Sequence, residues 1–198
     1  MHPTHFILPE ITDSLAYKPY LFTSNIDEED YDYSSVTYLL HYRHDILSLG
    51  TFIKLHSLIR AGYSVDITIV DYISNKLRFN ILYFLQSSVL NSRFMLATWS
   101  SEASSVISLQ SIFPAFNWSE REIWDLYGLF IIKHPDLRRL LTDYGFVGHP
   151  LRKDFPLTGF KEVQYEDSIK HVEYLDIELS QSYRLLFFNR PWSHQSND

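Results

Sequence analysis

Three charged residues in direct succession, Glu120, Arg121 and Glu122, could transfer protons. Carboxylates beside an arginine are common in acid–base sites. The same residues also fit a helix start, with Ser119 as N-cap and Glu122 closing a capping box. Arg121 and Asp125 have the i,i+4 spacing of an ion pair. Because cap, helix dipole and ion pair account for every charge, we expect a structural role.

His134 and His149 are candidate metal ligands. Each directly precedes a proline, Pro135 or Pro150, in a sequence typical of turns, and no third candidate stands at a usual ligand spacing. The chain contains no Cys, which excludes disulfides, a Cys nucleophile and iron–sulfur clusters held by its own thiolates. We therefore expect no metal or redox cofactor on this chain.

Gly145 and Gly148 precede Arg152 and Lys153, a combination that could suggest phosphate binding. A P-loop needs G-x-x-x-x-G-K-[ST] between a strand and a helix, and neither requirement is met. The sequence therefore does not predict a phosphate loop.

Clustered basic residues could instead suggest nucleic-acid binding, but acidic residues among them nearly cancel the local charge. The basic residues are Arg138, Arg139, Arg152 and Lys153, and the acidic ones are Asp136, Asp143 and Asp154. The net charge of the chain is -7, opposite to that of a basic nucleic-acid surface. We expect these side chains to form ion pairs at a protein interface.

The elements that position these residues follow from hydrophobic periodicity. Alternation predicts four strands, at residues 36–42, 65–73, 76–85 and 93–99. Apolar faces predict a helix between Asp45 and Gly62, a short helix at 106–113, and a third helix at 119–127 that Gly128 ends. A strand, a helix and three further strands with short turns predict an α+β fold, a mixed sheet with helices on one face.

Residues 142–159 have neither helical nor strand periodicity. Long structureless loops are uncommon in compact domains and usually bind something. Apolar residues such as Phe146 and Phe155 would supply buried area against a partner. We expect an extended arm that is disordered in the isolated subunit and ordered in a complex, followed by short strands at 160–165 and 169–177.

Three regions result: an N-terminal extension at 1–35, an α+β core domain at 36–141 and an extended C-terminal interface arm at 142–198. The acidic run at 27–32 favours a solvated extension, with a docking strip for a basic partner as the alternative. No apolar stretch reaches the roughly 18 to 20 residues that span a bilayer.

Residues 120–128 and 134–159 together resemble the signature and C-terminal arm of the 30-kilodalton subunit family of respiratory complex I. The resemblance is strong from Trp118 to Gly159 and looser elsewhere between residues 47 and 192. The matching residues are Glu120, Arg121, Glu122, Asp125, Gly128, His134, Pro135, Asp136, Arg138, Arg139, Asp143, Tyr144, Gly145, Gly148, His149, Pro150, Arg152, Lys153, Asp154, Phe155 and Pro156.

The resemblance implies a structural core subunit in the quinone-reducing module of the peripheral arm of NADH:ubiquinone oxidoreductase. Such a subunit supports electron transfer and proton pumping but has no catalytic centre of its own. The complex uses FMN, iron–sulfur clusters, NADH and ubiquinone, and this chain would bind none of them. The implied partners are the 49-kilodalton subunit and neighbouring cluster-bearing subunits, with no nucleic acid and no membrane span.

Two other functions remain open: a scaffold subunit of a related membrane-bound hydrogenase-like complex, and a self-standing enzyme. The arm beyond Gly159 and the sequence Arg190-Pro191-Trp192 resemble the respiratory branch, and no nucleophile–base pair supports the enzyme. Abundant Tyr, Phe and Ile without a presequence fit the matrix side of the mitochondrial inner membrane. The alternative is the cytoplasmic side of a bacterial plasma membrane.

Overall fold

The structure, a computed structural model, describes residues 36–40, 46–57, 59–89 and 91–184. The expected extension at 1–35 and the expected helix cap at Asp45 lie outside them. The chain divides into two compact units between Phe155 and Pro156, later than the expected boundary after residue 141. A mixed sheet with two helices, and short strands near the C-terminus, confirm the predicted α+β class.

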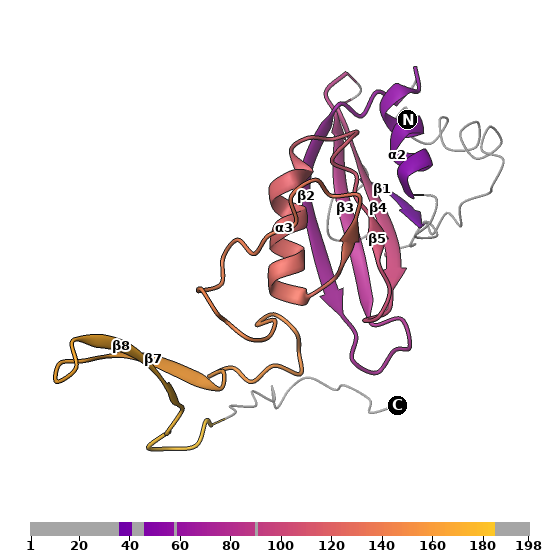
Figure 1. Cartoon of the computed structure of the whole chain (residues 1–198). Coiled ribbons are helices and arrows are strands. Elements are labelled where there is room, and N and C mark those ends of the chain that lie inside the picture. Colours follow the sequence, from indigo (N-terminus) through magenta and orange to yellow (C-terminus); the bar gives the residue numbers. More distant parts are fainter. Residues whose placement is uncertain (1–35, 41–45, 58, 90, 185–198) are drawn as a thin grey trace, which may run out of the picture. The chain divides into compact units, whose positions relative to one another are not determined.

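The first unit contains a four-stranded sheet in the order β1-β4-β3-β2 (Figure 1). β1 (Val36–Leu40) runs parallel to β4 (Ser92–Ser100). β3 (Phe79–Ser87) pairs antiparallel with β4 and with β2 (Tyr63–Asp71). All four predicted strands are confirmed, and period-two alternation places one side of β2, β3 and β4 in the core.

β2 ends the strand order and carries an irregularity. Its register against β3 shifts between Ser64 and Asp66, which marks a β-bulge. The Asp66 carboxylate accepts the backbone N–H of the next residue, Ile67, at 2.8 Å. A side chain of the strand itself therefore satisfies this amide.

α2 (Ile46–Leu55) ends earlier than predicted. The N–H of His56 still bonds to the carbonyl of Phe52, and the chain then turns through Arg60, whose φ is 44°. The left-handed conformation that often follows a helix falls on Arg60, two residues before the glycine at the predicted helix end. The turn places Ile59 and Ala61 in the core, at 1% and 0% exposure, and this burial outweighs continuation of the helix.

The helix predicted at 106–113 is wrong. β5 (Val106–Ile107) pairs parallel with β6 (Ile131–Ile132), and a turn follows it at 109–113. Paired β-branched residues favour a strand over a helix, and the sequence alone does not show that the partner strand lies beyond the next helix.

α3 (Phe116–Tyr127) begins before Ser119, so the predicted capping box is wrong. Its N-cap, Ala115, makes no side-chain cap hydrogen bond. Phe116 is 1% exposed and packs against Phe113 and Tyr83. Burying a Phe contributes about 1.5–3 kcal/mol, against about 1 kcal/mol for a cap, so packing sets the helix start.

Both helices and the inward-facing strand residues share one hydrophobic core. It contains Ile46, Leu49 and Ile53 of α2, Ile67 and Ile69 of β2, Phe79, Ile81, Tyr83 and Leu85 of β3, Phe94 and Leu96 of β4, and Phe116 and Ile123 of α3. This core forms the base on which the residues after α3 are held.

The second unit contains an antiparallel hairpin of β7 (Lys161–Glu166) and β8 (His171–Asp176). The two short strands predicted after Gly159 are therefore confirmed. Every β7 residue is exposed or half-buried, and so is every β8 residue.

Candidate interface site

Residues 139–155, called the pinned segment below, form turns and bends rather than a helix or strand. The fully buried Asp125 carboxylate of α3 holds the first end. It accepts the backbone N–H groups of Leu140, Leu141 and Thr142 at 3.1, 2.7 and 2.9 Å, and the Thr142 hydroxyl at 2.6 Å. The segment expected to lie on another protein is thus tied to its own helix.

These hydrogen bonds fix the charge of Asp125. Burial alone would raise its pKa, but the hydrogen bonds from Thr142, Leu141 and Leu140 outweigh burial and lower the pKa. The Arg139 guanidinium adds an ion pair at 3.4 Å. Asp125 is therefore an ionised buried acceptor that orders the backbone in front of it.

The predicted ion pair between Arg121 and Asp125 is wrong. Arg121 donates to the carbonyl of Arg138 at 3.2 Å and lies 5.2 Å from the centroid of the Trp118 ring. A surface i,i+4 pair contributes only a few tenths of a kcal/mol, whereas a buried carboxylate needs several donors. The buried Asp125 carboxylate therefore takes its hydrogen bonds from residues 140–142 and its ion pair from Arg139, and not from Arg121.

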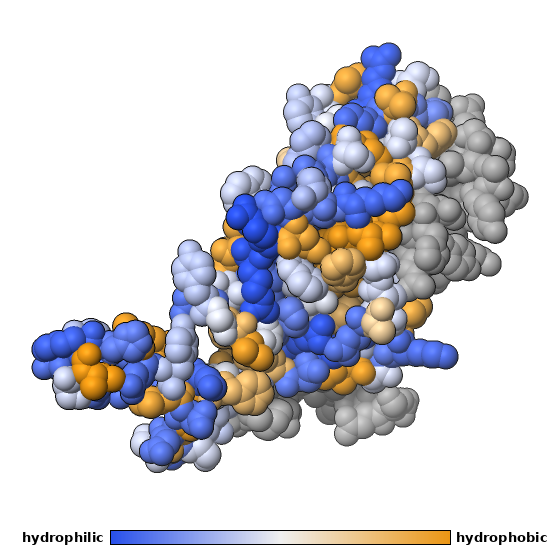
Figure 2. Space-filling model, viewed as in Figure 1, coloured by the Kyte–Doolittle hydropathy of each residue, from blue (hydrophilic) through white to orange (hydrophobic). Residues whose placement is uncertain are grey.

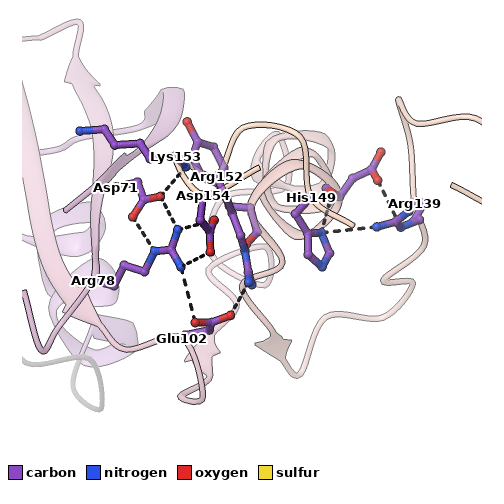
Figure 3. Close-up of polar contacts among 10 residues, drawn as sticks. Asp71, Arg78, Glu102, Arg139, His149, Arg152, Lys153 and Asp154 are labelled. Atoms are coloured by element: carbon purple, nitrogen blue, oxygen red, sulfur yellow. Dashed lines mark hydrogen bonds and ion pairs between the residues drawn. The ribbon is translucent and has the colours of Figure 1, made fainter. Parts of the chain in front are cut away.

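The second end of the pinned segment is held beside the turn between β2 and β3 (Figure 3). Arg78 donates to both oxygens of Asp71, at 2.7 and 2.8 Å, and to both oxygens of Asp154, at 2.7 and 3.1 Å. Asp71 also accepts the backbone N–H of Lys153 at 2.9 Å. The hydrogen bonds from Arg78 lower the pKa of both carboxyls. Such bidentate pairs are strong and fix geometry.

A further arginine joins this network. Arg152 donates to the carbonyl of Tyr127 at the end of α3 and forms an ion pair with Glu102. The sequence predicts ion pairs across an interface for Arg152, Lys153 and Asp154, whereas Arg152 and Asp154 pair within this chain. Their charges therefore hold the pinned segment in place.

Two glycines allow the close packing of the segment. At Gly128, with φ of 72°, an added Cβ would lie 2.5 Å from the His149 ring. At Gly148, with φ of 111°, it would lie 2.7 Å from the Phe155 ring. His149 Nδ1 donates to the carbonyl of Asp125 at 2.9 Å, and burial lowers the pKa of the imidazole. Burial thus favours the neutral imidazole, which acts as a packing and hydrogen-bonding group.

Contacts among residues of the pinned segment itself hold its middle in place. Arg139 donates to the carbonyls of Phe146 and Gly148, and the rings of Phe146 and Phe155 lie 5.9 Å apart. Other apolar side chains of the segment face outward: Leu141 is 60% exposed, Tyr144 93%, Val147 85% and Leu151 51%. Hydrophobic residues also reach the molecular surface elsewhere (Figure 2). A fixed backbone that displays apolar groups suits binding to another protein.

The first candidate acid–base residue lies in the core. Glu120 accepts the Ser108 hydroxyl at 2.5 Å and the Leu109 N–H at 2.8 Å. Burial raises the pKa of Glu120 to about 7. The buried His134 ring lies 3.9 Å from it and 3.3 Å from the carbonyl of Asn117. Glu120 joins α3 to the end of β5, which agrees with the expected structural role. It does not lie in the first turn of α3, where it was expected to interact with the helix dipole.

The remaining predicted residues lie at the surface or partly buried. Asp136 and Arg138 form a surface ion pair at 2.7 Å, and the others are Glu122, Pro135, Asp143, Gly145, Pro150 and Pro156. Sequence reasoning missed Asp71, Arg78 and Glu102. The available signal was an Asp at the end of an apolar strand and an Arg directly before the next strand.

Within the described part of the chain, no three His, Asp or Glu side chains gather in a way that could hold a metal ion. Nor does any helix in these residues have the length and apolarity to cross a membrane. The geometry can present a surface to a partner, and we find no acid–base pair open to a substrate among the described site residues.

Comparisons with known proteins identify the family of the chain. A model of the respiratory-chain NADH dehydrogenase 30 Kd subunit matches residues 39–161. NADH dehydrogenase [ubiquinone] iron-sulfur protein 3 of Solanum tuberosum is 48% identical over 152 residues, covering 77% of this chain and 80% of the relative. A subunit of the NADH-quinone oxidoreductase of Chelativorans sp. (strain BNC1) is 48% identical over 148 residues, covering 75% of this chain and 74% of the relative.

The fold also occurs in a solved archaeal assembly. A chain of the membrane-bound sulfane sulfur reductase, an archaeal respiratory membrane complex, superposes with a TM-score of 0.64 at 18% identity, covering 78% of this chain and 86% of that one. At that identity the likeness shows the fold alone. The family match and the far more similar relatives show that this chain belongs to the family of the 30-kilodalton subunit of respiratory-chain NADH dehydrogenase.

Proposed function

We propose that the chain is a structural subunit of the peripheral arm of NADH:quinone oxidoreductase, in its quinone-reducing module. The family match over residues 39–161 carries this proposal. In this role the chain supports electron transfer from NADH to ubiquinone, and the proton pumping coupled to it, by holding neighbouring subunits in register. The complex uses FMN and iron–sulfur clusters, and this chain binds no cofactor of its own.

The pinned segment is the proposed contact surface. Its backbone is fixed from both ends, and Tyr144 and Val147 are the most exposed of its apolar side chains. Because the surface is already ordered, binding loses little conformational entropy. The partner is the 49-kilodalton subunit, with the cluster-bearing subunits nearby. This surface replaces the expectation of an arm that orders only in the complex.

The second candidate is a scaffold subunit of a membrane-bound hydrogenase-like complex. The archaeal likeness extends only to the fold, at 18% identity, whereas two relatives named for NADH oxidation are 48% identical. This difference favours the first proposal. The plant relatives favour the matrix side of the mitochondrial inner membrane, and the bacterial relative keeps the cytoplasmic face of a plasma membrane as the alternative location.

Native electrophoresis of an affinity-tagged chain tests the assignment. The tag should migrate with the band that oxidises NADH and reduces a quinone analogue, and depletion of the chain should remove that band. Comigration with a hydrogen-evolving complex, or with no larger assembly, would overturn the proposal.

A further inference from the structure

The His149 ring lies between two arginine side chains at the end of α3 (Figure 3). Its Nδ1 is 2.9 Å from the carbonyl oxygen of Asp125 and 3.4 Å from Nη2 of Arg139. On the other side, a Cβ added at Gly128 would lie 2.5 Å from Nε2 of His149 and 2.6 Å from Nη2 of Arg152. The imidazole is therefore held close to two guanidinium groups.

The hydrogen bond to Asp125 decides which ring nitrogen is open to a further proton. A carbonyl oxygen can only accept, so Nδ1 carries the proton of the neutral ring, and Nε2 takes up the second one. Within the part of the chain that the structure describes, Nε2 makes no hydrogen bond. A proton added at Nε2 would lie close to Gly128 and to the Arg152 guanidinium, which offers donors only.

The carboxylates around the ring are already paired. Arg152 forms an ion pair with Glu102 and donates to the carbonyl of Tyr127. Arg139 forms an ion pair with Asp125, which also accepts four hydrogen bonds from residues 140–142. An imidazolium at this place would be a third cation without a carboxylate of its own, which is unfavourable in a partly buried site.

Burial has the largest influence on the His149 imidazole, and it lowers the pKa below the ordinary value of 6.5. The charges of Arg152 and Arg139 act in the same direction, against the carbonyl and the carboxylate of Asp125, which favour the protonated ring. The folded chain therefore binds this proton less readily than the unfolded chain. The stability that the neutral ring gives is fully present above pH 6.5 and is lost as the pH falls through the lowered pKa.

We propose that His149 is an acid-sensitive latch: proton uptake at Nε2 loosens the pinned segment from the end of α3. The latch belongs to this chain alone. Because the same segment displays Tyr144 and Val147, a protein that binds to them would bind more weakly in acid. This last consequence rests on the proposed function, whereas the latch itself does not.

Proton NMR of the full chain measures the titration of the ring, assigned by through-bond correlation to the backbone amide of His149. The ring should titrate below pH 6.5. Arg139→Gln removes one neighbouring cation and should shift the titration upward. Arg138→Gln is the matched control, because this adjacent arginine pairs with Asp136 at the surface, and it should leave the titration unchanged. A wild-type titration at or above pH 6.5, or no difference between the two variants, would overturn the proposal.

Hydrogen exchange of the full chain measures the loosening. The N–H of Leu151 donates to the carbonyl of Leu126 at 3.1 Å and so joins the pinned segment to α3. Its protection factor should fall by at least about threefold between about pH 7.5 and about pH 5.5, with a limit of about tenfold per pH unit for one proton. His149→Asn keeps an N–H donor on a short side chain but cannot take up a proton, so it should show no such fall.

An equal fall of the Leu151 protection factor in the wild type and in His149→Asn would overturn the proposal, as would no fall in the wild type. If His149→Asn does not fold, the wild-type titration and the two arginine variants still decide. Both measurements use the full chain outside any assembly, so they test the latch separately from the proposed function, which the native electrophoresis described above tests.

Discussion

The pinned segment and the hairpin follow one another in the chain, yet they are ordered by opposite means. The pinned segment has no regular structure, but buried carboxylates and an arginine network hold its backbone. The hairpin has regular strand pairing, but its side chains remain exposed or half-buried. Regular secondary structure is therefore a poor guide to rigidity here, and buried polar anchors are a better one.

Among the changes considered, loss of Arg78 should weaken the anchoring of the pinned segment most strongly. Arg78→Ala leaves Asp71, at 4% exposure, without its main partner. Removal of one partner from a buried ion pair costs about 3–5 kcal/mol, so the free energy of unfolding measured in urea should fall by that order. Lys170→Ala is the control, because its pair with Asp167 is exposed, and it should leave the value unchanged. An equal, small effect of both variants would show that Arg78 does not anchor the segment.

Removal of Asp125 should release the first end of the pinned segment. Asp125→Ala leaves three backbone N–H groups and the Thr142 hydroxyl without their acceptor. The expected loss is about 2–3 kcal/mol, with faster amide hydrogen exchange at residues 140–142. Exchange at residues 161–176 should not change. If both regions exchange faster together, the two are not independently ordered.

Gly148→Ala tests the packing inside the segment. The added Cβ would meet the Phe155 ring at 2.7 Å, at a backbone φ of 111°, and should cost about 1–3 kcal/mol. Gly145→Ala is the matched control, since it has a positive φ of 74° but no atom within 4 Å of the added Cβ. Thermal unfolding should rank Gly148→Ala as the more damaging variant. In a Phe155→Ala background, the difference in stability between the two glycine variants should be smaller. If it is not, the cost of Gly148→Ala comes from its backbone conformation alone.

Glu120 and Asp125 belong to the same helix, but their pKa values shift in opposite directions. The pKa of Glu120 is raised from 4.5 to about 7, so the folded state binds the extra proton. The stability that this proton binding adds to the folded state is fully present below pH 4.5 and is lost as the pH rises through about 7. Glu120→Gln should remove a slope of at most about 1.4 kcal/mol per pH unit from the unfolding free energy. Hydrogen exchange of the pinned segment should stay as in the wild type, and an unchanged slope in the variant would place the titration elsewhere.

The sequence predicts the sheet, the third helix and the hairpin strands because their periodicity is local. It misplaces the start of α3, since the burial of Phe116 against Tyr83 depends on distant residues. The strand at Val106–Ile107 is missed for the same reason, because its partner lies after α3.

The candidate site shows the same limit. The family signature marks Asp125, Arg139 and Asp154, but spacing alone pairs Asp125 with the wrong arginine. The acceptor for the Lys153 amide is Asp71, 82 residues away, and no local pattern joins them. Gly128 at the helix end follows from sequence, whereas the need for Gly148 appears only once the Phe155 ring is seen beside it.

The irregularity of β2 affects how the unassembled chain can pair with other extended chains. A strand at the end of a sheet offers a template to any other extended chain, and newly made subunits meet many such chains. The bulge between Ser64 and Asp66 breaks the regular strand geometry there. The Asp66 carboxylate, which accepts the Ile67 amide, also places a negative charge on this strand. We expect this bulge and its charged residue to disfavour strand addition to β2 while the subunit is not yet assembled.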